Sequence, residues 1–442
     1  MKPLDVHGAG DPLEEWRGCR RLPLSRVPGP RSLAAWAERE HGYVALLESG
    51  AGFPERSRYT LVAVGAERVY TASEPGDVYE ALRSAARGSG CWSLPCRGLL
   101  FGVVGYEAVA GSEEWLAPRL GRHEWPPLLV FKPRALVVYD HLQGRATLCP
   151  GDAELGEARV EDGFEARGPV EATPRESFVS WVEEAKRMLS EGEFLQVVLS
   201  RFERYTYRGS PLALYERLAG ENPSPYMFYM RLGGFWIAGA SPELLVKMDR
   251  GKLETHPIAG TRPRGSTPEE DTELEIELLT DEKERAEHMM LVDLARNDLG
   301  AVAVPGSVRV TALMEVEKYS RVQHLVSRVE ALAARWASYT DVLAAVNPAG
   351  TVSGAPKPRA MEVIASLEDR PRGPYAGAAG MYSDYAGETA IVIRSVWGVD
   401  EETLETRAGA GIVYDSVPER EYMETVHKLA AIHRALGVRP GA

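Results

Sequence analysis

The chain has 442 residues, of which 44% are hydrophobic and 26% are charged, and its formal net charge is −13. This length and balance predict a globular protein with a sizeable core and room for two or three domains. An acidic chain is a poor partner for a phosphate backbone, so we expect no nucleic-acid partner. A site for a small anion must gather its own positive groups.

Cysteine use and the N-terminus bear on the compartment. The four cysteines are Cys19, Cys91, Cys96 and Cys149. None of them forms a CxxC pair, which argues against zinc, and their low number fits a reducing compartment while leaving room for an isolated disulfide. The first 16 residues contain no apolar run of signal-peptide or membrane length. We therefore expect a cytoplasmic protein without a membrane partner.

The first 150 residues are typical of a β-rich domain. β-Branched runs bounded by turn residues predict strands or hairpins at 43–50, 59–72, 98–109 and 133–149. Asp77 is a suitable cap for one short helix that ends near Arg87. From 151 to 173 the apolar periodicity disappears and Gly, Glu, Ala and Pro dominate, so we expect a linker there.

Residues 174–442 are expected to form a second domain. Thr173 and Glu176 have capping-box spacing around Pro174, which predicts a helix that reaches about Gly192. Strand-like segments, a helix at 211–219 and two long helices follow. Because strands and helices do not alternate regularly, we expect an α+β fold and not a doubly wound parallel sheet.

The first long helix, DEKERAEHMMLVDLARNDLG, places two acids on its inward face. Asp281 can cap the first turn, and Glu284 is positioned to return the bond. Glu284 and Glu287 share a face with Leu291 and Leu294. A carboxylate pair on a core-facing stripe requires a cation, because burial of an unpaired carboxylate is costly.

The last helix repeats this pattern with Glu421, Glu424 and Lys428 at i, i+3 and i+7. Two Glu-x-x-Glu helices can converge on one hard metal ion, and oxygen ligands suit Mg²⁺. The alternative for either pair is a solvated charged face, which is where most charged helix residues lie. A di-iron bundle needs Glu-x-x-His, and His288 lacks that spacing from Glu284.

Four glycine-rich segments indicate an anion-binding cavity. They are PIAGTRPRG (257–265), NPAGTVSGAPKPRA (347–360), YAGAAGMYSDYAG (375–387) and RAGAGIVYDS (407–416). Glycine lets backbone N–H groups approach carboxylate or phosphate oxygens. None of the segments is a Walker motif or a dinucleotide fingerprint. With Lys357, Arg394 and Lys428 nearby in sequence, they favour a multiply charged carboxylate bound together with Mg²⁺.

From about Thr173 onward the chain resembles the chorismate-utilising enzymes, and within them the large subunits (component I) of anthranilate synthase. The family's motifs occur in order as PIAGTRPRG, DEKERAEHMMLVDLARND, RVQHLVS, NPAGTVSGAPK and AGAGIVYDSVPEREYMET. The N-terminal part matches through LLES (46–49) and the pair Arg58-Tyr59. The resemblance implies two stacked, largely antiparallel sheets covered by helices, which agrees with the α+β expectation.

Two positions distinguish the branches of this family. Aminodeoxychorismate synthases typically carry lysine in PIKGT, where this chain has Ala259. Isochorismate and salicylate synthases usually place a lysine base where this chain has Gln196. An enzyme that uses ammonia needs no side-chain base to activate its nucleophile, so the glutamine is chemically consistent with amination.

The resemblance also implies roles for the acids and for one histidine. Glu287 and Glu424 are expected to contact Mg²⁺, with Glu284 and Glu421 as inner or water-mediated partners. Glu243 aligns with the acid that protonates the departing ring hydroxyl; otherwise it is a first-turn helix acid after Ser241-Pro242. His324 aligns with a histidine linked to pyruvate elimination, and its alternative is a core histidine with satisfied hydrogen bonds.

Further residues carry over as contacts to chorismate. They are Gly260, Thr261, Thr351, Tyr375, Arg394, Gly409, Ala410, Gly411 and Lys428. Arg394 is the strongest of these because a guanidinium can pair bidentately with a carboxylate. Tyr375 could equally be an aromatic residue packed in the core.

Two segments resemble the end-product site of anthranilate synthases. LLES supplies Glu48 and Ser49, and NPSPYMF supplies Pro225, Tyr226, Met227 and Phe228. Glu48 would pair with the amino group of L-tryptophan, and the apolar residues would flank the indole. The alternative is ordinary strand and turn structure.

Together these expectations describe an Mg²⁺-dependent enzyme that converts chorismate and ammonia into anthranilate and pyruvate, under feedback inhibition by L-tryptophan. No cysteine lies in a nucleophile-elbow pattern, so a separate glutamine amidotransferase subunit is expected to supply ammonia, in a heterotetramer. The aminodeoxychorismate branch is the alternative enzyme. A catalytically silent relative that binds tryptophan or a partner is the alternative of another class, which the four glutamates disfavour.

Overall fold

The computed structural model describes residues 18–50, 58–89, 98–319 and 322–439. The first eight helices and strands are β1 (Arg20–Pro23), α2 (Pro30–His41), β2 (Tyr43–Glu48), β3 (Tyr59–Ala72), α3 (Val78–Ala86), β4 (Leu100–Val104), β5 (Leu128–Asp140) and β6 (Arg145–Cys149). A 3₁₀ helix, η3, occupies Tyr106–Gly111. The strands confirm the β-rich character expected for this part.

The remaining elements begin with β7 (Phe164–Ala172), α4 (Arg175–Ser190), β8 (Gln196–Gly209), α5 (Pro211–Glu221), β9 (Tyr226–Leu232), β10 (Phe235–Ser241), β11 (Leu244–Asp249), β12 (Lys252–Thr255) and β13 (Ile258–Pro263). They continue with α6 (Pro268–Thr280), α7 (Glu282–Gly300), β14 (Arg309–Lys318), β15 (Val322–Leu332), α8 (Tyr339–Val346), α9 (Gly350–Ser353) and β16 (Gly354–Ala355). The last are α10 (Lys357–Leu367), β17 (Ala378–Tyr382), β18 (Gly387–Ile391), β19 (Ser395–Gly398), β20 (Thr403–Ile412) and α11 (Pro418–Leu436).

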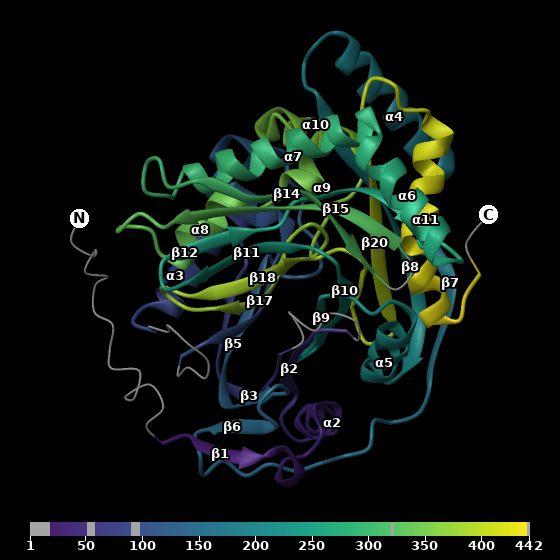
Figure 1. The fold of residues 1–442 in the computed structure, drawn as a ribbon. Helices are drawn as coiled ribbons and strands as arrows, with labels where there is room; N and C mark the ends of the chain where they lie inside the picture. Colours follow the sequence, from purple (N-terminus) through teal and green to yellow (C-terminus); the bar gives the residue numbers. More distant parts are fainter. Residues whose placement is uncertain (1–17, 51–57, 90–97, 320–321, 440–442) are drawn as a thin grey trace.

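Every strand pair between these elements is antiparallel, and the pairs link all the strands into one hydrogen-bonded network. In Figure 1, β11, β12, β14, β15, β17 and β18 run across the view, while β8 and β20 run steeply to them. Helices α7 and α10 lie above the first set, and α4 and α11 lie beside the second. The α+β class predicted from the sequence is confirmed.

Strands from both ends of the chain are neighbours in this network. β2 lies between β3 and β9, with Glu48 opposite Met227. β4 lies between β5 and β17. Within the range predicted as a linker, β7 pairs with β8, so that part is a strand. The division into domains at 1–150 and 174–442 stays a prediction.

Two buried apolar clusters stabilise the arrangement. The larger one contains residues of α3, α4, α8 and α10 together with many strands. The second lies under α2, α5 and the C-terminal half of α11. The C-terminal end of helix α11 is therefore firmly packed. Its N-terminal turns carry the acids, and the helix packs against the glycine-rich strand β20.

Local predictions were wrong at three helix starts. Helix α2 was not predicted, although Pro30 at its first turn and the spacing of Leu33, Ala34 and Ala37, all buried, are helix signals. The expected capping box at α4 is absent: Pro174 is the N-cap, and the Thr173 hydroxyl accepts a hydrogen bond from the Phe202 N–H instead. Asp77 stands at the N-cap of α3 but makes no side-chain capping bond.

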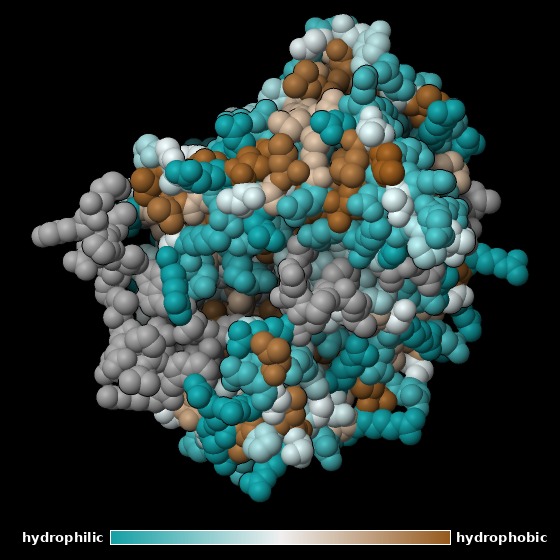
Figure 2. All heavy atoms as spheres, in the orientation of Figure 1, coloured by the Kyte–Doolittle hydropathy of each residue, from teal (hydrophilic) through white to brown (hydrophobic). Residues whose placement is uncertain are grey.

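The described part of the face shown in Figure 2 is mainly hydrophilic. Figure 2 shows apolar side chains gathered over the upper part of the molecule, where α7 and β14 lie in Figure 1. Exposed apolar residues of these elements include Met289, Val310 and Leu313. Among the described helices, none combines the length and the apolar character needed to cross a membrane.

A disulfide joins Cys19 to Cys149 and closes the chain over a separation of 130 residues. It lies beside the pairing of β1 with β6, where Arg20 is opposite Leu148. This is the isolated disulfide for which the sequence leaves room. Cys91 and Cys96 lie outside the described residues.

We predict that loss of this disulfide destabilises the protein without changing its fold. Cross-linking a long loop lowers the entropy of the unfolded chain, so the double substitution Cys19→Ser/Cys149→Ser should lower the free energy of unfolding by about 2–5 kcal/mol. Denaturant titration measures this. Dithiothreitol should lower the stability of the wild type and leave the double variant unaffected; equal stability of the two proteins would contradict the prediction.

Candidate active site

Helix α7 presents its two acids to the interior as the sequence predicts. The Asp281 carboxylate caps it by accepting hydrogen bonds from the N–H groups of Lys283 and Glu284. Glu284 does not complete a capping box, because its carboxylate pairs with Arg262 at 3.1 Å. Glu284 and Glu287 are half-buried, and Leu291 one turn further on is buried. The acids therefore lie at the edge of the packed face.

Helix α11 presents a matching face. Glu421, Glu424 and Lys428 are all half-buried. The Lys428 ammonium lies 2.6 Å from the Glu424 carboxylate and donates a hydrogen bond of 2.8 Å to the Gly409 carbonyl. Lys428 thus joins the acidic face of α11 to the glycine-rich strand β20.

The charges of the two helices interact. Burial raises the pKa of Glu287, and the negative charges of Glu284 and Glu424 raise it further, against the effect of Lys283. Burial likewise raises the pKa of Glu421, where Glu424 adds to the shift and Lys283 of α7 opposes it. The structure therefore brings the four predicted acids into one electrostatic cluster.

The donor set of this cluster fits a hard cation. It offers carboxylate oxygens only, and these acids raise one another's pKa, which a divalent cation would reverse. Among the described residues no three acidic, histidine or cysteine side chains form a ready-made metal site. That is compatible with Mg²⁺, which usually takes one or two carboxylates and completes its shell with substrate oxygens and water.

Glu243 lies between β10 and β11 and is 6% exposed. Burial raises the pKa of its carboxyl to about 8, although the Thr351 hydroxyl, the Ile258 backbone and the Lys428 charge act in the opposite direction. The alternative role as a first-turn helix acid is wrong, because the residue connects two strands. Glu243 is therefore a buried carboxylic acid, protonated at neutral pH, beside Thr351 and Lys428.

His324 of β15 lies opposite Thr261 of β13. Its Nδ1 is 2.9 Å from the Gly260 carbonyl and 3.0 Å from the Thr261 hydroxyl. Because a carbonyl only accepts, Nδ1 carries the proton and Nε2 is left as the basic nitrogen. Burial lowers the pKa of this imidazole to about 4, and the charges of Arg394 and Lys428 add to the effect. His324 is thus neutral at neutral pH.

Gly260 allows α7 to approach β13 closely. Its φ of +68° lies in the left-handed region, and a Cβ there would come within 3.1 Å of the Glu284 carboxylate and 2.9 Å of Leu278. A larger residue would push Glu284 away from the strand. The glycine in the motif PIAGT therefore serves a close approach, as its type suggests.

Arg394 lies beside Lys428, and Tyr375 lies beside Gly409. Arg394 donates a 3.0 Å hydrogen bond to the Lys428 carbonyl and has a φ of +52°. Burial lowers the pKa of this guanidinium, while Tyr375 and Glu424 act against the shift. Tyr375 is buried in the core as its alternative reading states, yet its hydroxyl would lie 2.7 Å from a Cβ placed on Gly409. The packed ring is confirmed, and the role of the Tyr375 hydroxyl as a contact to chorismate stays a prediction.

The remaining predicted contacts lie on β8, α9 and β20. Thr351 belongs to α9, and Gly409, Ala410 and Gly411 belong to β20. Gln196 starts β8 and is 7% exposed; its amide nitrogen would lie 2.6 Å from a Cβ on Gly411. Its amide oxygen is buried and has no hydrogen-bond partner in the part of the chain that the structure describes. The structure does not test the role of Gln196.

Lys357 is not part of this cluster of charged residues. Its ammonium pairs with Asp298 at the end of α7, at 2.6 Å, and lies near the carbonyls of Ala345 and Val346. The lysine therefore neutralises a buried acid and the end of α8, a structural role that sequence proximity to glycine cannot reveal.

The two segments predicted for tryptophan are neighbours. Glu48 lies opposite Met227, and the Gly50 N–H bonds to the Ser224 carbonyl at 2.8 Å. Pro225, Met227 and Phe228 are buried, and Tyr226 is half-buried. Ser49 follows Glu48 directly after β2.

Sequence reasoning missed the partners of Glu48. The Glu48 carboxylate accepts hydrogen bonds from Arg31 of α2 at 2.8 Å and from the Tyr215 hydroxyl of α5 at 2.7 Å. The signal that could have pointed to Arg31 was the helix pattern after Pro30. Tyr215 gave no comparable signal.

Comparisons with known proteins agree with this geometry. Residues 44–434 match the family model described as chorismate binding enzyme. The chain belongs to the chorismate-binding enzymes. It is 55% identical to anthranilate synthase component 1 of Aeropyrum pernix, with 97% of this chain and 98% of that protein covered. It is 42% identical to the protein of that name from Saccharolobus solfataricus, with 94% and 99% covered.

Solved structures of chorismate-binding enzymes share the fold. Anthranilate synthase component I of Streptococcus pneumoniae superposes with a TM-score of 0.71 at 32% identity, covering 84% of this chain and 91% of that one. The menaquinone-specific isochorismate synthase of Escherichia coli superposes with a TM-score of 0.75 at 21% identity, covering 95% of both. The second likeness concerns the fold alone.

We predict that Glu243 makes stability depend on pH. Its pKa rises from 4.5 when unfolded to about 8 when folded, so it costs stability progressively as the pH rises from about 4.5 to 8. Glu243→Gln removes this cost. The free energy of unfolding of the variant, relative to that of the wild type, should therefore rise by about 1.4 kcal/mol per pH unit over this range, to a total of a few kcal/mol.

Denaturant titrations at pH 5 and pH 9 measure the effect. Glu419→Gln, at an exposed position of α11, is the control and should follow the wild type at both pH values. Parallel behaviour of Glu243→Gln and the wild type would contradict the buried, neutral state of Glu243.

Proposed function

We propose that this chain, with Mg²⁺, converts chorismate and ammonia into anthranilate and pyruvate, the first step of tryptophan biosynthesis. The observation that carries the proposal is Glu243, a buried acid with a pKa of about 8 between Thr351 and Lys428. The curated relatives quoted above bear the name anthranilate synthase component 1, which supports the same reaction.

Substrate binding follows from the positive groups. Chorismate carries two carboxylates, and Arg394 and Lys428 line the cavity as cations, with the Tyr375 hydroxyl beside β20. Backbone N–H groups of Gly409–Gly411 can be approached closely because no side chain intervenes at the glycines. These groups bind and orient the two carboxylates so that the ring faces Glu243.

Glu287 and Glu424 would hold Mg²⁺, with Glu284 and Glu421 as partners or through water. When bound, the ion supplies positive charge that fixes one substrate carboxylate. Lys283 forms an ion pair with Glu287, and Lys428 forms one with Glu424, so each lysine partly neutralises one of these acids.

Glu243 acts as the acid of the amination. The nitrogen of ammonia forms a bond to the ring, the C–O bond of the ring hydroxyl breaks, and the proton of Glu243 goes to the departing oxygen, which leaves as water. The ammonium group formed on the ring then loses a proton to solvent or to the Glu243 carboxylate. Gln196 cannot serve as a base, so the nucleophile must arrive as neutral ammonia.

Aromatisation follows by loss of pyruvate. A ring proton is removed, and the bond from the ring carbon to the oxygen of the enolpyruvyl group breaks. The departing enolpyruvate takes up a proton at its methylene carbon, which gives pyruvate beside the aromatic anthranilate. His324 is neutral and has a basic Nε2, so it can take or relay that proton. Ala259 and Gln196 stand where relatives of other branches carry lysine, and both favour this outcome over aminodeoxychorismate or isochorismate formation.

The relatives' name, component 1, supports a second component for this chain. We propose that it is a glutamine amidotransferase that delivers ammonia, in a heterotetramer. We further propose that L-tryptophan binds where Glu48 and Ser49 meet Pro225–Phe228, and that its ammonium group displaces Arg31 or Tyr215 as the partner of Glu48.

We predict that the purified chain forms anthranilate from chorismate, Mg²⁺ and ammonium at alkaline pH, with an equimolar amount of pyruvate. Anthranilate fluorescence and mass spectrometry follow the products. Glu424→Gln should lower the rate by at least about 100-fold, because it removes a ligand of the ion. Glu419→Gln, exposed on the same helix, should retain the rate.

Other products would decide against the proposal. A product that keeps the enolpyruvyl group would assign the chain to the aminodeoxychorismate branch. Chorismate binding without turnover, with ammonium present, would favour a silent relative or an obligatory partner.

We predict that L-tryptophan inhibits this reaction and raises the melting temperature. Glu48→Gln should weaken inhibition by about 10-fold or more, because it removes the charge that pairs with the ammonium group. Glu67→Gln, on the exposed part of β3, is the control. Unchanged activity and melting temperature at millimolar tryptophan would refute this regulatory site.

A further inference from the structure

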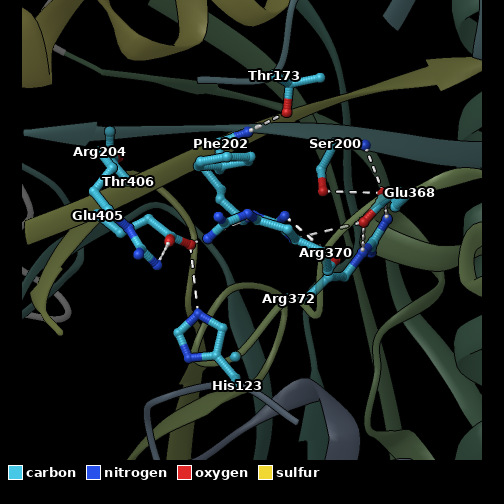
Figure 3. Close-up of polar contacts among 12 residues, drawn as sticks. His123, Thr173, Ser200, Phe202, Arg204, Glu368, Arg370, Arg372, Glu405 and Thr406 are labelled. Atoms are coloured by element: carbon cyan, nitrogen blue, oxygen red, sulfur yellow. Dashed lines mark hydrogen bonds and ion pairs between the residues drawn. The ribbon is translucent and has the colours of Figure 1, made fainter. Parts of the chain in front are cut away.

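Arg372, in the loop between α10 and β17, is a fully buried cation beside the proposed substrate cavity. Its side chain is 1% exposed, and its partner Glu368 is 3% exposed. The Nε and Nη2 groups of Arg372 donate to the two oxygens of Glu368 at 3.0 and 2.6 Å (Figure 3). The Ser200 N–H and hydroxyl also donate to Glu368, at 2.7 and 3.0 Å. The pair is thus held rigidly before any ligand arrives.

The other edge of the guanidinium binds two backbone carbonyls. Nη1 donates to Val352 at 2.7 Å, and Nη2 donates to Val198 at 2.6 Å. Val352 follows Thr351, which acts to lower the pKa of the buried acid Glu243. Val198 lies opposite Gly411 in the pairing of β8 with β20. One guanidinium therefore joins α9, which carries Thr351, to β8, the strand that pairs with the glycines of β20.

The faces of the guanidinium contact two aromatic rings. The guanidinium carbon is 4.8 Å from the centre of the Tyr106 ring and 5.5 Å from that of Tyr375. The Tyr375 hydroxyl lies beside Gly409. The Glu107 carboxylate, next to Tyr106 in η3, accepts hydrogen bonds from the N–H groups of Arg372 and Gly373 at 2.7 and 3.2 Å. Arg372 is thus fixed by both its side chain and its backbone.

We propose that Arg372, held by Glu368, is a positioning residue that sets the places of Thr351, Tyr375 and the Gly409–Gly411 backbone around the ligand. It does not itself touch the substrate. The inference rests on the proposed function only in taking chorismate as the ligand. A lysine cannot replace this arginine, because a single ammonium cannot bind Glu368 and two carbonyls in one plane while it stacks between two rings.

Arg407 offers a matched control. It is also 1% exposed, lies 3.6 Å from the same Glu368 and 3.7 Å from Glu405, and stacks on the Phe202 ring. Its Nη2 donates to the Arg370 carbonyl, whereas Nε and Nη1 have no hydrogen-bond partner among the described residues. The side chain of Arg407, a residue of β20, therefore shares the buried network of Glu368, Arg370 and Glu405, which Figure 3 labels, and does not bind the carbonyls of Val352 and Val198.

The test compares Arg372→Lys with Arg407→Lys. Chorismate affinity is measured by titration calorimetry with Mg²⁺ and without ammonium, and KM is measured separately for chorismate and for ammonium. Arg372→Lys should weaken chorismate binding and raise its KM by about 10-fold or more, with the KM for ammonium changed less than about twofold. Arg407→Lys should leave both KM values within about threefold, even if its melting temperature falls as far.

Equal effects of the two variants on chorismate binding, or an equal change in both KM values of Arg372→Lys, would overturn the proposal in favour of a purely structural arginine. If Arg372→Lys does not fold, Glu368→Gln carries the test, with Glu405→Gln as its control, and should raise the KM for chorismate alone. If the wild type binds chorismate but makes no anthranilate, the proposed function fails while the calorimetric comparison still decides the role of Arg372.

Discussion

Four half-buried carboxylates can share one cavity only because positive side chains lie among them. Ion pairs hold three of these acids: Lys283 pairs with Glu287, Arg262 with Glu284, and Lys428 with Glu424. Each pair offsets part of the cost of moving an anion out of water. Burial raises the pKa of Glu287 and of Glu421, and the residual repulsion between the carboxylates raises both further. A divalent cation held between α7 and α11 would relieve that repulsion, which would account for four acids lying together.

Lys428 connects this cluster to the rest of the site. It binds the Gly409 carbonyl, its charge lowers the pKa of Glu243 and of His324, and its own carbonyl accepts a hydrogen bond from Arg394. Lys428 thus couples the acidic face of α11, Glu243 and the glycine-rich strand β20. Glu243 and His324 are nevertheless both neutral at neutral pH, because burial dominates the pKa of each.

Local patterns predicted the parts of the fold that depend on local physics. Helix α11 carries Glu421, Glu424 and Lys428 as the spacing predicted, and the pattern of α7 correctly placed Glu284 and Glu287 on its inward face. The family motifs located Glu243, whose burial the structure then supplied. Sequence could not reveal the Arg372–Glu368 pair, because a buried ion pair is recognised by its surroundings and not by its residue types. The same holds for Lys357, which looked like a ligand for an anion but binds Asp298.

The central claim is that chorismate binding requires a cation held by α7 and α11. Titration calorimetry of chorismate into the protein, with Mg²⁺ or with EDTA and without ammonium, tests it most directly. The account predicts tight binding with Mg²⁺, binding weaker by at least about 10-fold with EDTA, and loss of this difference in Glu287→Gln and Glu424→Gln. Equal affinity in Mg²⁺ and in EDTA would contradict it.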